Sequence, residues 1–407
     1  MNTLKTNKLT DLVALRMLAT SGFLTVGAKA YFKDQLVGKR NGQTYGFVIR
    51  DTGTAAKGLS VDKLTQKTNI VEKQIDLTLD PWHIYIESNA IEGVTDLTWD
   101  EEVAKPNGKK LGNKVVRDAV EAAVSKPAVT FIGSGFQPLA EASAHIGSIT
   151  DEEMYGFTDP KIQAVLTSNG QQFNPVGSPS TLYSKGLLGE FHNVEYRSQR
   201  FFPQVKVAAG LANLLNGATA KVVVKDAAKA TVTVTYASSG TYVGNVPKGL
   251  PVMIEGVYAC DLVGDVTSNL YSFIVPSNIS ASGGSFAFDV DLPTTAVGGT
   301  MQIAKADGTA WDITVANGDL KDLEIVPIEA GTYFMAQIRA NGAYEFETLD
   351  KLDTANKETK IGSVEGITVH ENRVLDLMNM VNGTRWDIVS LSGVVENRAV
   401  ANVLIKA

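Results

Sequence analysis

The side chains that most often carry out catalysis or bind metals are few and far apart in this chain. The four histidines are His83, His145, His192 and His370, and none stands in an HExxH or other paired spacing that would place two imidazoles on one metal ion. The single cysteine, Cys260, cannot close an internal disulfide and is expected to pack as a small apolar group. The sequence therefore disfavours metal catalysis and Cys/His zinc clusters.

Acidic side chains are grouped at two places, and neither group predicts a cation site. Asp151, Glu152 and Glu153 follow Thr150, an arrangement typical of the first turn of a helix, where the helix dipole favours negative charge. The stretch 289–291, Asp-Val-Asp, fits solvation at the edge of a strand, because an EF-hand loop needs a twelve-residue ligand pattern with a closing glutamate.

Motifs for phosphate binding and for nucleophilic catalysis are also missing from the sequence. No G-x-x-x-x-G-K-[ST] occurs, and the stretch 133–135, Gly-Ser-Gly, lacks the third glycine of a nucleotide loop, which favours a tight turn. Ser134 does not stand in the G-x-S-x-G frame of a nucleophile elbow. The sequence thus favours binding or assembly over catalysis.

Length and composition set wide limits on the fold. The chain has 407 residues, 44% of them apolar, and at about 150 residues per domain this predicts two to three domains with substantial cores. Lys and Arg number 37 against 44 Asp and Glu, a net charge of −7, so contact with a polyanion must be local. No run of about 18 apolar residues occurs, which argues against a membrane-spanning helix. The composition predicts a soluble, folded protein.

Residues 1–30 allow two interpretations. Two lysines followed by the apolar stretch 12–26 imitate a secretory signal, but Asp11 and Arg16 would place charges in its apolar core. We favour a short amphipathic arm, because its apolar residues lie three or four apart, as on one helix face: Leu9, Leu12, Val13 and Met17.

The arm lies in a basic part of the chain. Residues 1–50 carry eight Lys and Arg against two Asp, a local charge of +6, whereas the rest of the chain sums to −13. Such an arm could contact phosphates through counterion release, or it could present an ordinary solvated helix face. The candidate contact residues are Lys5, Lys8 and Arg16.

A hairpin is predicted after the arm. Residues 45–50 and 69–79 suit β-strands, and the second alternates apolar and polar residues from position 75. The stretch 51–58 between them is small, polar and flexible, so the hairpin tip has no core of its own and needs a partner to rest on. After the Asp-Pro pair 80–81, the alternation at 82–87 predicts a further strand.

A long, interrupted helix is predicted next. Residues 98–101, Thr-Trp-Asp-Glu, have the spacing of a capping box, and the stretch 106–108, Pro-Asn-Gly, should break or kink the helix. A short buried strand is predicted after the helix, at residues 129–132. Between the Pro-Asn-Gly stretch and this strand, apolar residues recur at helical spacing: Leu111, Val115, Val116, Val120 and Val124.

The remainder divides into a mixed body and a β-rich insertion. Helices are predicted at 151–155 and 180–188, a buried strand at 162–166, and closing strands at 386–391 and 399–405. Around residue 208 the composition changes, and a β domain of about 130 residues is predicted inside the α/β body. Its expected strands are 222–224, 231–236, 251–258, 270–275, 286–290 and 311–315.

Several stretches carry a resemblance to a known family: 11–13 with Gly38 and 42–50, then 76–80, 101–106, 189–194 and 248–257. In order, they resemble an N-terminal arm entering an extended loop, the returning strand of that loop, the start of a proline-broken spine helix, the approach to an insertion, and a strand pair within it. The chain thus resembles the major capsid (coat) proteins of tailed double-stranded DNA phages, of the short-tailed type with an inserted β domain.

The resemblance implies an α+β chain with the Hong Kong 97-like phage capsid fold and an inserted, all-β, barrel-like domain. The implied divisions are an N-terminal arm (1–37), an extended hairpin loop (38–80), a peripheral domain with the spine helix (81–127), a first axial part (128–207), the inserted β domain (208–337) and a closing axial and peripheral part (338–407).

The resemblance also implies a non-enzymatic function without a cofactor. The subunit would self-assemble as pentamers and hexamers into the icosahedral shell of a virion, with assembly in the host cytoplasm and no membrane partner. Implied partners are a scaffolding protein, a portal protein and packaged double-stranded DNA held by non-specific contacts. Under this hypothesis Lys5, Lys8 and Arg16 face inwards, towards DNA or scaffold. A hairpin and an arm without support are liabilities in a monomer but become contacts between copies in a shell.

Two alternatives remain at this point. An encapsulin-type compartment shares the fold but typically lacks a large inserted β domain. An enzyme or carbohydrate-binding protein would use the β domain instead, with Trp311 and Tyr258 as a sugar platform, although aromatic side chains at strand spacing are more often part of a core.

Overall fold

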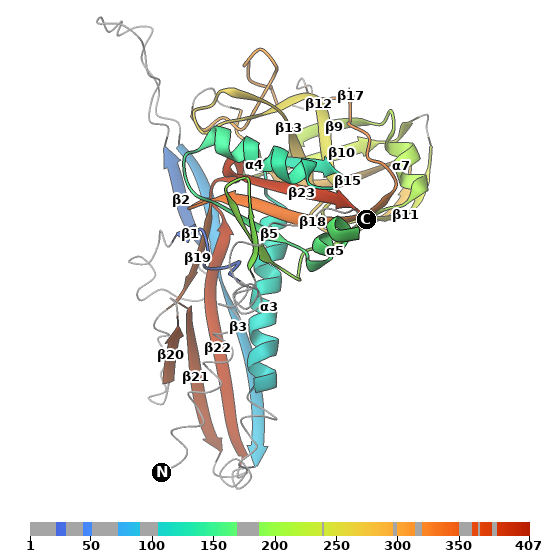
Figure 1. The fold of residues 1–407 in the computed structure, drawn as a ribbon. Coiled ribbons are helices and arrows are strands. Elements are labelled where there is room, and N and C mark those ends of the chain that lie inside the picture. Colours follow the sequence, from blue (N-terminus) through green and yellow to red (C-terminus); the bar gives the residue numbers. More distant parts are fainter. Residues whose placement is uncertain are drawn as a thin grey trace, which may run out of the picture.

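The computed structural model describes residues 22–29, 44–50, 72–89, 105–168, 187–237, 240–295, 299–313, 320–349, 360–364, 367–376 and 381–407. These residues form an α+β protein in which a long sheet and one long helix extend from two more compact groups of strands and helices (Figure 1). In this part of the chain no helix has the length and apolar character needed to cross a membrane.

The long sheet is built around strand β22. Its order is β1-β19-β22-β21-β20, and β3 also pairs with β22. Helix α3 runs alongside β3 and β22 (Figure 1). Buried Trp386 and Ile388 of β22 and half-buried Trp82 and Ile84 of β3 join the core that includes the apolar face of α3. The bounds are β1 Ala28–Lys29, β3 Glu72–Asn89, α3 Lys105–Val124, β19 Tyr344–Thr348, β20 Lys360–Val364, β21 Ile367–Asp376 and β22 Val381–Val394.

Strand β3 differs from the prediction in one respect. Its first half pairs with β2 (Thr44–Arg50), with Thr44 opposite Thr78, which confirms the predicted pairing of the two hairpin strands. The separate strand expected at 82–87 is instead the second half of β3, which runs on through Pro81 and pairs with β22. The proline is tolerated because β22 is the only described partner of this half, and an edge strand does not need every N–H.

Helix α3 confirms the predicted apolar face and corrects the predicted break. Leu111, Val115, Val116, Val120 and Val124 are all buried. The helix as described, Lys105–Val124, continues through the Pro-Asn-Gly stretch. This stretch lies in the first described turn, where an N–H has no intrahelical acceptor, so the N–H that proline lacks costs no hydrogen bond. The helix start predicted at 98–101 lies outside the described residues.

A second sheet forms the centre of the molecule, in the order β4-β23-β18-β5-β7-β6, with β8 also paired to β18. The pairs β4–β23 and β5–β7 are parallel, and helix α4 packs against the sheet. The strand predicted at 129–132 is confirmed as β4, and that at 399–405 as β23. The bounds are β4 Val129–Gly133, α4 Gln137–Ile149, β5 Met154–Thr158, α5 Pro160–Ser168, β6 Leu187–Phe191, β7 Val194–Ser198, β8 Val205–Val207, β18 Gly331–Ala340 and β23 Val400–Lys406.

Two predictions in this region were wrong. The acids at 151–153 do not start a helix: Thr150 is the C-cap of α4, and the three exposed acids lead into β5. The strand predicted at 162–166 is helix α5, in which Ile162 and Leu166 are buried one turn apart. The Asp159 carboxylate accepts a hydrogen bond from the Lys161 N–H at 2.8 Å and so caps this helix.

Of the helix predicted at 180–188, the last two residues belong to β6, and the rest lies outside the described residues. This end of the prediction was wrong because Leu187–Phe191 pairs antiparallel with β7. A five-residue stretch carries too few periods to distinguish strand from helix before its partner is known.

The third group of elements contains the remaining strands, in sheets ordered β15-β10-β9-β17, β13-β12-β16 and β11-β14. The strands predicted at 222–224, 231–236, 251–258, 270–275 and 286–290 correspond to β9, β10, β12, β13 and β15. The described part of 311–315 contains no strand. The bounds are α7 Ala209–Leu215, β9 Thr219–Val224, β10 Lys229–Thr235, β11 Tyr242–Val246, β12 Pro251–Cys260, β13 Val266–Ile274, β14 Ile279–Gly283, β15 Ser285–Asp291, β16 Ile303–Ala304 and β17 Leu323–Glu324.

Candidate assembly surfaces

The structure does not bring the histidines or the cysteine into one site. His83 is exposed on β3 and His192 is exposed between β6 and β7, whereas His145 on α4 and His370 on β21 are buried in different parts of the molecule. Burial raises the pKa of the Cys260 thiol to about 12, so this thiol is protonated and unreactive at neutral pH. Within the described ranges, no three His, Cys, Asp or Glu side chains are grouped as a metal ion requires.

The two residues of the carbohydrate alternative, Trp311 and Tyr258, are both half-buried. Trp311 is half-buried against the main core, and the Lys305 ammonium lies 4.9 Å from the centroid of its ring. Tyr258 stands in β12, between Leu270 of β13 and Ala304 of β16. A stacked sugar needs an open aromatic face, and the Trp311 ring already has a cation over it.

The ribbon of β2 and the first half of β3 is the first candidate surface for contact with another molecule. At its base, Leu77 and Leu79 are buried against Leu349, Val389 and Leu391. The pairing of β3 with β22 ends at Leu79. From Thr78 to Glu72, β3 pairs only with residues 44–50 of β2 among the described strands. An isolated two-stranded ribbon is marginally stable in water, so this one needs a surface to rest on.

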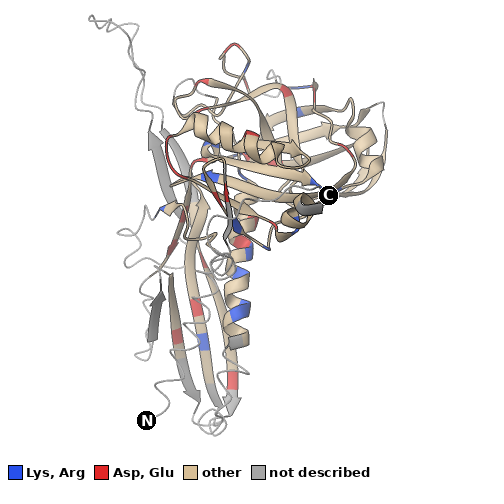
Figure 2. Cartoon of the chain, in the orientation of Figure 1, with Lys and Arg blue, Asp and Glu red and all other residues tan. Residues whose placement is uncertain are grey.

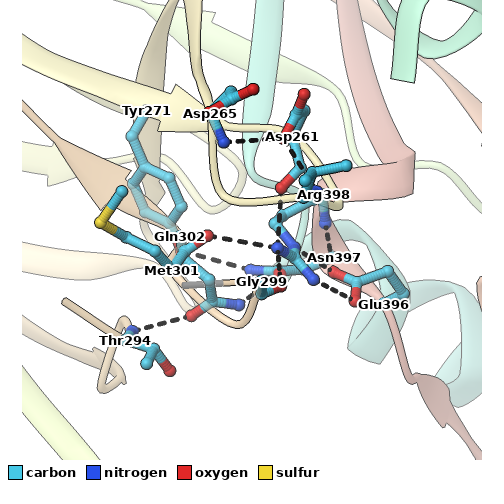
Figure 3. Close-up of polar contacts among 11 residues, drawn as sticks. Asp261, Asp265, Tyr271, Thr294, Gly299, Met301, Gln302, Glu396, Asn397 and Arg398 are labelled. Carbon is cyan, nitrogen blue, oxygen red and sulfur yellow. Dashed lines mark hydrogen bonds and ion pairs between the residues drawn. The ribbon is translucent and has the colours of Figure 1, made fainter. Parts of the chain in front are cut away.

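A buried polar joint connects the third group of strands to the central sheet (Figure 3). Arg398, 3% exposed, makes a bidentate ion pair with Glu396, with both N–O distances 2.8 Å. Its remaining nitrogen donates to the carbonyl oxygens of Asp261 at 2.7 Å, Gly299 at 2.6 Å and Met301 at 3.3 Å. One guanidinium therefore ties two loops of the β-rich group to the turn that precedes β23.

Amide side chains extend the same joint. The Gln302 amide donates to the Asn397 side chain, and its oxygen accepts from the Thr294 N–H at 3.0 Å. The Asn397 amide in turn donates to the Tyr271 hydroxyl at 3.4 Å (Figure 3). Gln302 and Tyr271 are buried and Asn397 is half-buried, so these hydrogen bonds are largely shielded from water and add to the connection made by Arg398.

His145 forms a second contact between the same two parts of the molecule. Its Nδ1 accepts a hydrogen bond of 2.9 Å from the Asn269 amide of β13, which fixes the neutral ring with the proton on Nε2. Burial lowers the pKa of His145 from 6.5 to about 4, because a charged imidazole would lose its hydration.

Acidification should therefore weaken folding through His145. In the unfolded chain His145 takes up a proton near pH 6.5, whereas in the folded chain it does so only near pH 4. The contribution of the neutral His145 to the free energy of unfolding is therefore fully present above pH 6.5 and is lost as the pH falls towards 4. Between about pH 7 and pH 5 the free energy of unfolding should fall by about 2 kcal/mol more in the wild type than in His145→Gln. Urea unfolding at both pH values measures this difference. The exposed His83 supplies the control, and a His145→Gln variant with the same pH dependence as His83→Gln would contradict the prediction.

The arm residues Lys5, Lys8 and Arg16 lie outside the described residues. Sequence reasoning did not identify Arg398, and an isolated arginine in Glu-Asn-Arg gives no signal of its contacts. It also missed the basic face of α3, although the signal was present. Four cations occupy the positions of this helix that its apolar residues leave free: Lys109, Lys110, Lys114 and Arg117.

No protein-family model matches the sequence, and no curated protein matches it. Solved structures do show similarity. The head structure of Helicobacter pylori bacteriophage KHP40 is similar with a TM-score of 0.42 at 9% identity, over 95% of this chain and 88% of that chain. The capsid structure of the cyanophage P-SCSP1u gives 0.41 at 8% identity over 93% and 89%. The mature capsid of bacteriophage PhiM1 gives 0.40 at 9% identity over 93% and 87%.

Proposed function

We propose that this chain is the major capsid protein of a tailed phage, self-assembling into the icosahedral shell that encloses a double-stranded DNA genome. The observation that carries the proposal is the ribbon of β2 and β3, which leaves the long sheet at residues 77–79 without a third strand among the described elements. The role is structural rather than catalytic, and the fold is of the Hong Kong 97-like type.

A second copy of the chain supplies the surface that the ribbon lacks. A ribbon that rests on a different part of its neighbour makes a heterologous contact, and repeated contacts of this kind close into rings when the rotation allows. Rings of five and six subunits would in turn form the shell. Many contacts that are each modest add up to a stable particle when they act together.

The other parts of the chain have roles in the same assembly. The proposed divisions are the arm (1–37), the extended loop (38–80), the peripheral domain with the spine helix (81–127), the first axial part (128–207), the inserted barrel-like domain (208–337) and the closing axial and peripheral part (338–407). Strand β18, Gly331–Ala340, crosses the boundary at residue 337. The Arg398 joint supports an inserted domain that is fixed rather than hinged. The arm, through Lys5, Lys8 and Arg16, would contact scaffold or packaged DNA, and a portal would occupy one vertex of a shell made in the host cytoplasm.

Electron microscopy of the purified protein tests this function. We expect closed particles some tens of nanometres across, formed by the protein alone or together with its scaffolding partner, because the ribbon and the arm complete themselves only on other copies. Sedimentation gives an independent measure of the fraction assembled. Monodisperse small species in both preparations, at concentrations well above those used for grids, would contradict the proposal.

A further inference from the structure

The outward face of α3 carries a concentration of positive charge on a chain that is negative overall. Lys109, Lys110, Lys114 and Arg117 are all exposed, and their blue segments follow the helix in Figure 2. The net charge of the whole chain is −7, so this face differs from the average surface. At 1.5 Å per residue the four cations span about 12 Å along the helix axis.

Helix stability does not account for these charges. Cations are favourable near the C-terminus of a helix, but the last turn of α3 contains none, and its first turn contains no acid. Lys110 and Lys114 are also four residues apart, a spacing at which like charges repel each other. The ion pair of Lys114 with Asp118, also four residues apart, balances only one of the four cations, so helix stability does not explain the whole arrangement.

Aromatic rings hold the basic side chains in place. The Lys114 ammonium lies 5.2 Å from the centroid of the Trp82 ring. The guanidinium groups of Arg117 and of neighbouring Arg200 lie 5.4 and 4.9 Å from the Phe201 ring. Arg200 is exposed and donates to the Asn113 side chain at 2.5 Å, which brings a fifth cation to the same face. A cation–π contact uses the face of the ring and not a hydrogen-bond acceptor, so an exposed lysine or arginine held in this way keeps donor capacity for a ligand.

Acidic residues nearby neutralise only part of this charge. Asp118 makes a 3.5 Å ion pair with Lys114, and Glu121 makes a 2.7 Å ion pair with Lys248. Asp80 adds one more carboxyl, whose pKa is raised by burial and by the nearby Asp118. With Glu121 and Lys248 counted as a neutral pair, the five cations of the face against Asp118 and Asp80 give a net charge of +3.

We propose that this face, consisting of Lys109, Lys110, Lys114, Arg117 and Arg200, binds the phosphate backbone of double-stranded nucleic acid without reading its sequence. The proposal deepens the capsid function and rests on it for the identity of the ligand as packaged DNA. A nucleic acid fits better than an acidic protein because the exposed residues within 106–124 are four cations and Pro106, while the nearby Trp82 and Phe201 rings are half-buried and have cations over them. Stable protein interfaces are centred on aromatic or large aliphatic anchors, whereas phosphate contacts need only cations.

The test compares two quadruple variants that remove the same charge. K109Q/K110Q/K114Q/R117Q neutralises the face, and K206Q/K221Q/K229Q/K321Q neutralises four exposed lysines on β8, β9, β10 and the loop before β17. Binding of a mixed-sequence duplex of about 30 base pairs to unassembled subunits is measured by fluorescence anisotropy between roughly 50 and 200 mM salt. Thermal unfolding checks that both variants remain folded. In the α3 variant the loss of the Lys110–Lys114 repulsion offsets the loss of the exposed Lys114–Asp118 ion pair, so its stability should be close to that of the wild type.

We expect the α3 variant to lose at least about tenfold in affinity for the duplex at low salt. The slope of the logarithm of its association constant against the logarithm of the salt concentration should become less negative by about three to four units, because each of the four lost phosphate contacts contributes about 0.9. The control should change affinity by less than about twofold, because its lysines are dispersed. Equal losses in both variants, or an unchanged slope in the α3 variant, would overturn the proposal.

Two further readouts separate this inference from the capsid function. Poly-glutamate that competes as well as the duplex at equal charge would assign the face to an acidic polypeptide and overturn the proposal. Shells that disappear while duplex binding is unchanged would assign it to contacts between copies, which also overturns it. Failure of the wild type to form particles counts against the capsid function alone, because duplex binding is measured on free subunits.

Discussion

Replacing residues 51–71 by Asn-Gly is expected to give a folded subunit that forms no shells. Arg50 and Glu72 stand opposite each other at the end of the described ribbon, so a two-residue turn can close the hairpin without changing its register. The buried base of the ribbon, with Leu77 and Leu79, remains in place. The free energy of unfolding should therefore change by less than about 1 kcal/mol, while the contact with a neighbouring copy loses its outer part.

Sedimentation and electron microscopy of this variant measure assembly, and urea unfolding measures folding. A control replaces the exposed turn 226–228 between β9 and β10 by Gly-Ser-Gly, because this turn belongs to a different sheet from the ribbon and should leave assembly intact. Shells of normal size and yield from the 51–71 variant would show that the ribbon is not the assembly contact. Loss of folded subunit would show instead that the ribbon belongs to the core.

Substituting Arg339 by alanine should cause a large loss of stability. Arg339 lies in β18, is fully buried, and donates hydrogen bonds to the carbonyl oxygens of Phe23 at 2.5 Å and Val26 at 2.6 Å. Its guanidinium carbon lies 4.8 Å from the ring centroid of Phe23, 4.5 Å from that of Phe157 and 4.4 Å from that of Tyr344. Burial lowers its pKa to about 10, so the side chain remains charged at neutral pH.

Arg339→Ala leaves a cavity between three rings and removes the partners of two buried carbonyl groups, which together should cost about 3–5 kcal/mol. Arg339→Met keeps most of the volume and removes a desolvated charge, so its loss should be smaller, about 1–2 kcal/mol. Urea unfolding measures both, with Lys206→Ala on the paired strand β8 as an exposed control. Faster proteolysis within 22–29 should accompany the loss in Arg339→Ala. Equal stability of the alanine variant and the control would show that Arg339 does not hold this segment.

Long periodic patterns predicted the elements that they belong to. The apolar face of α3 was correct because five buried positions recur over almost four turns, which no strand can imitate. The hairpin was correct because two alternating runs flank a polar stretch. Most strands of the β-rich group were predicted for the same reason, since turn residues separate them at short, regular intervals.

Short segments were predicted less well because few residues carry little periodicity. Residues 162–166 contain Ile162, Val165 and Leu166, which fit a buried strand, yet Pro160 and the Asp159 cap start a helix there. The acids at 151–153 suit a helix start in isolation, but the preceding helix has already used Thr150 as its C-cap. In both cases the neighbouring element decided the outcome.

The sequence by itself determined that this chain has a long amphipathic helix, a hairpin with a polar tip and a β-rich segment within a mixed body, because these properties follow from periodicity along the chain. Only the tertiary structure decided that β3 continues past Pro81 to join β22, that Arg339 holds the segment 22–29, and that Arg398 ties the β-rich group to β23. These contacts join residues more than 90 positions apart, and the burial that makes them strong exists only once the sheets have formed.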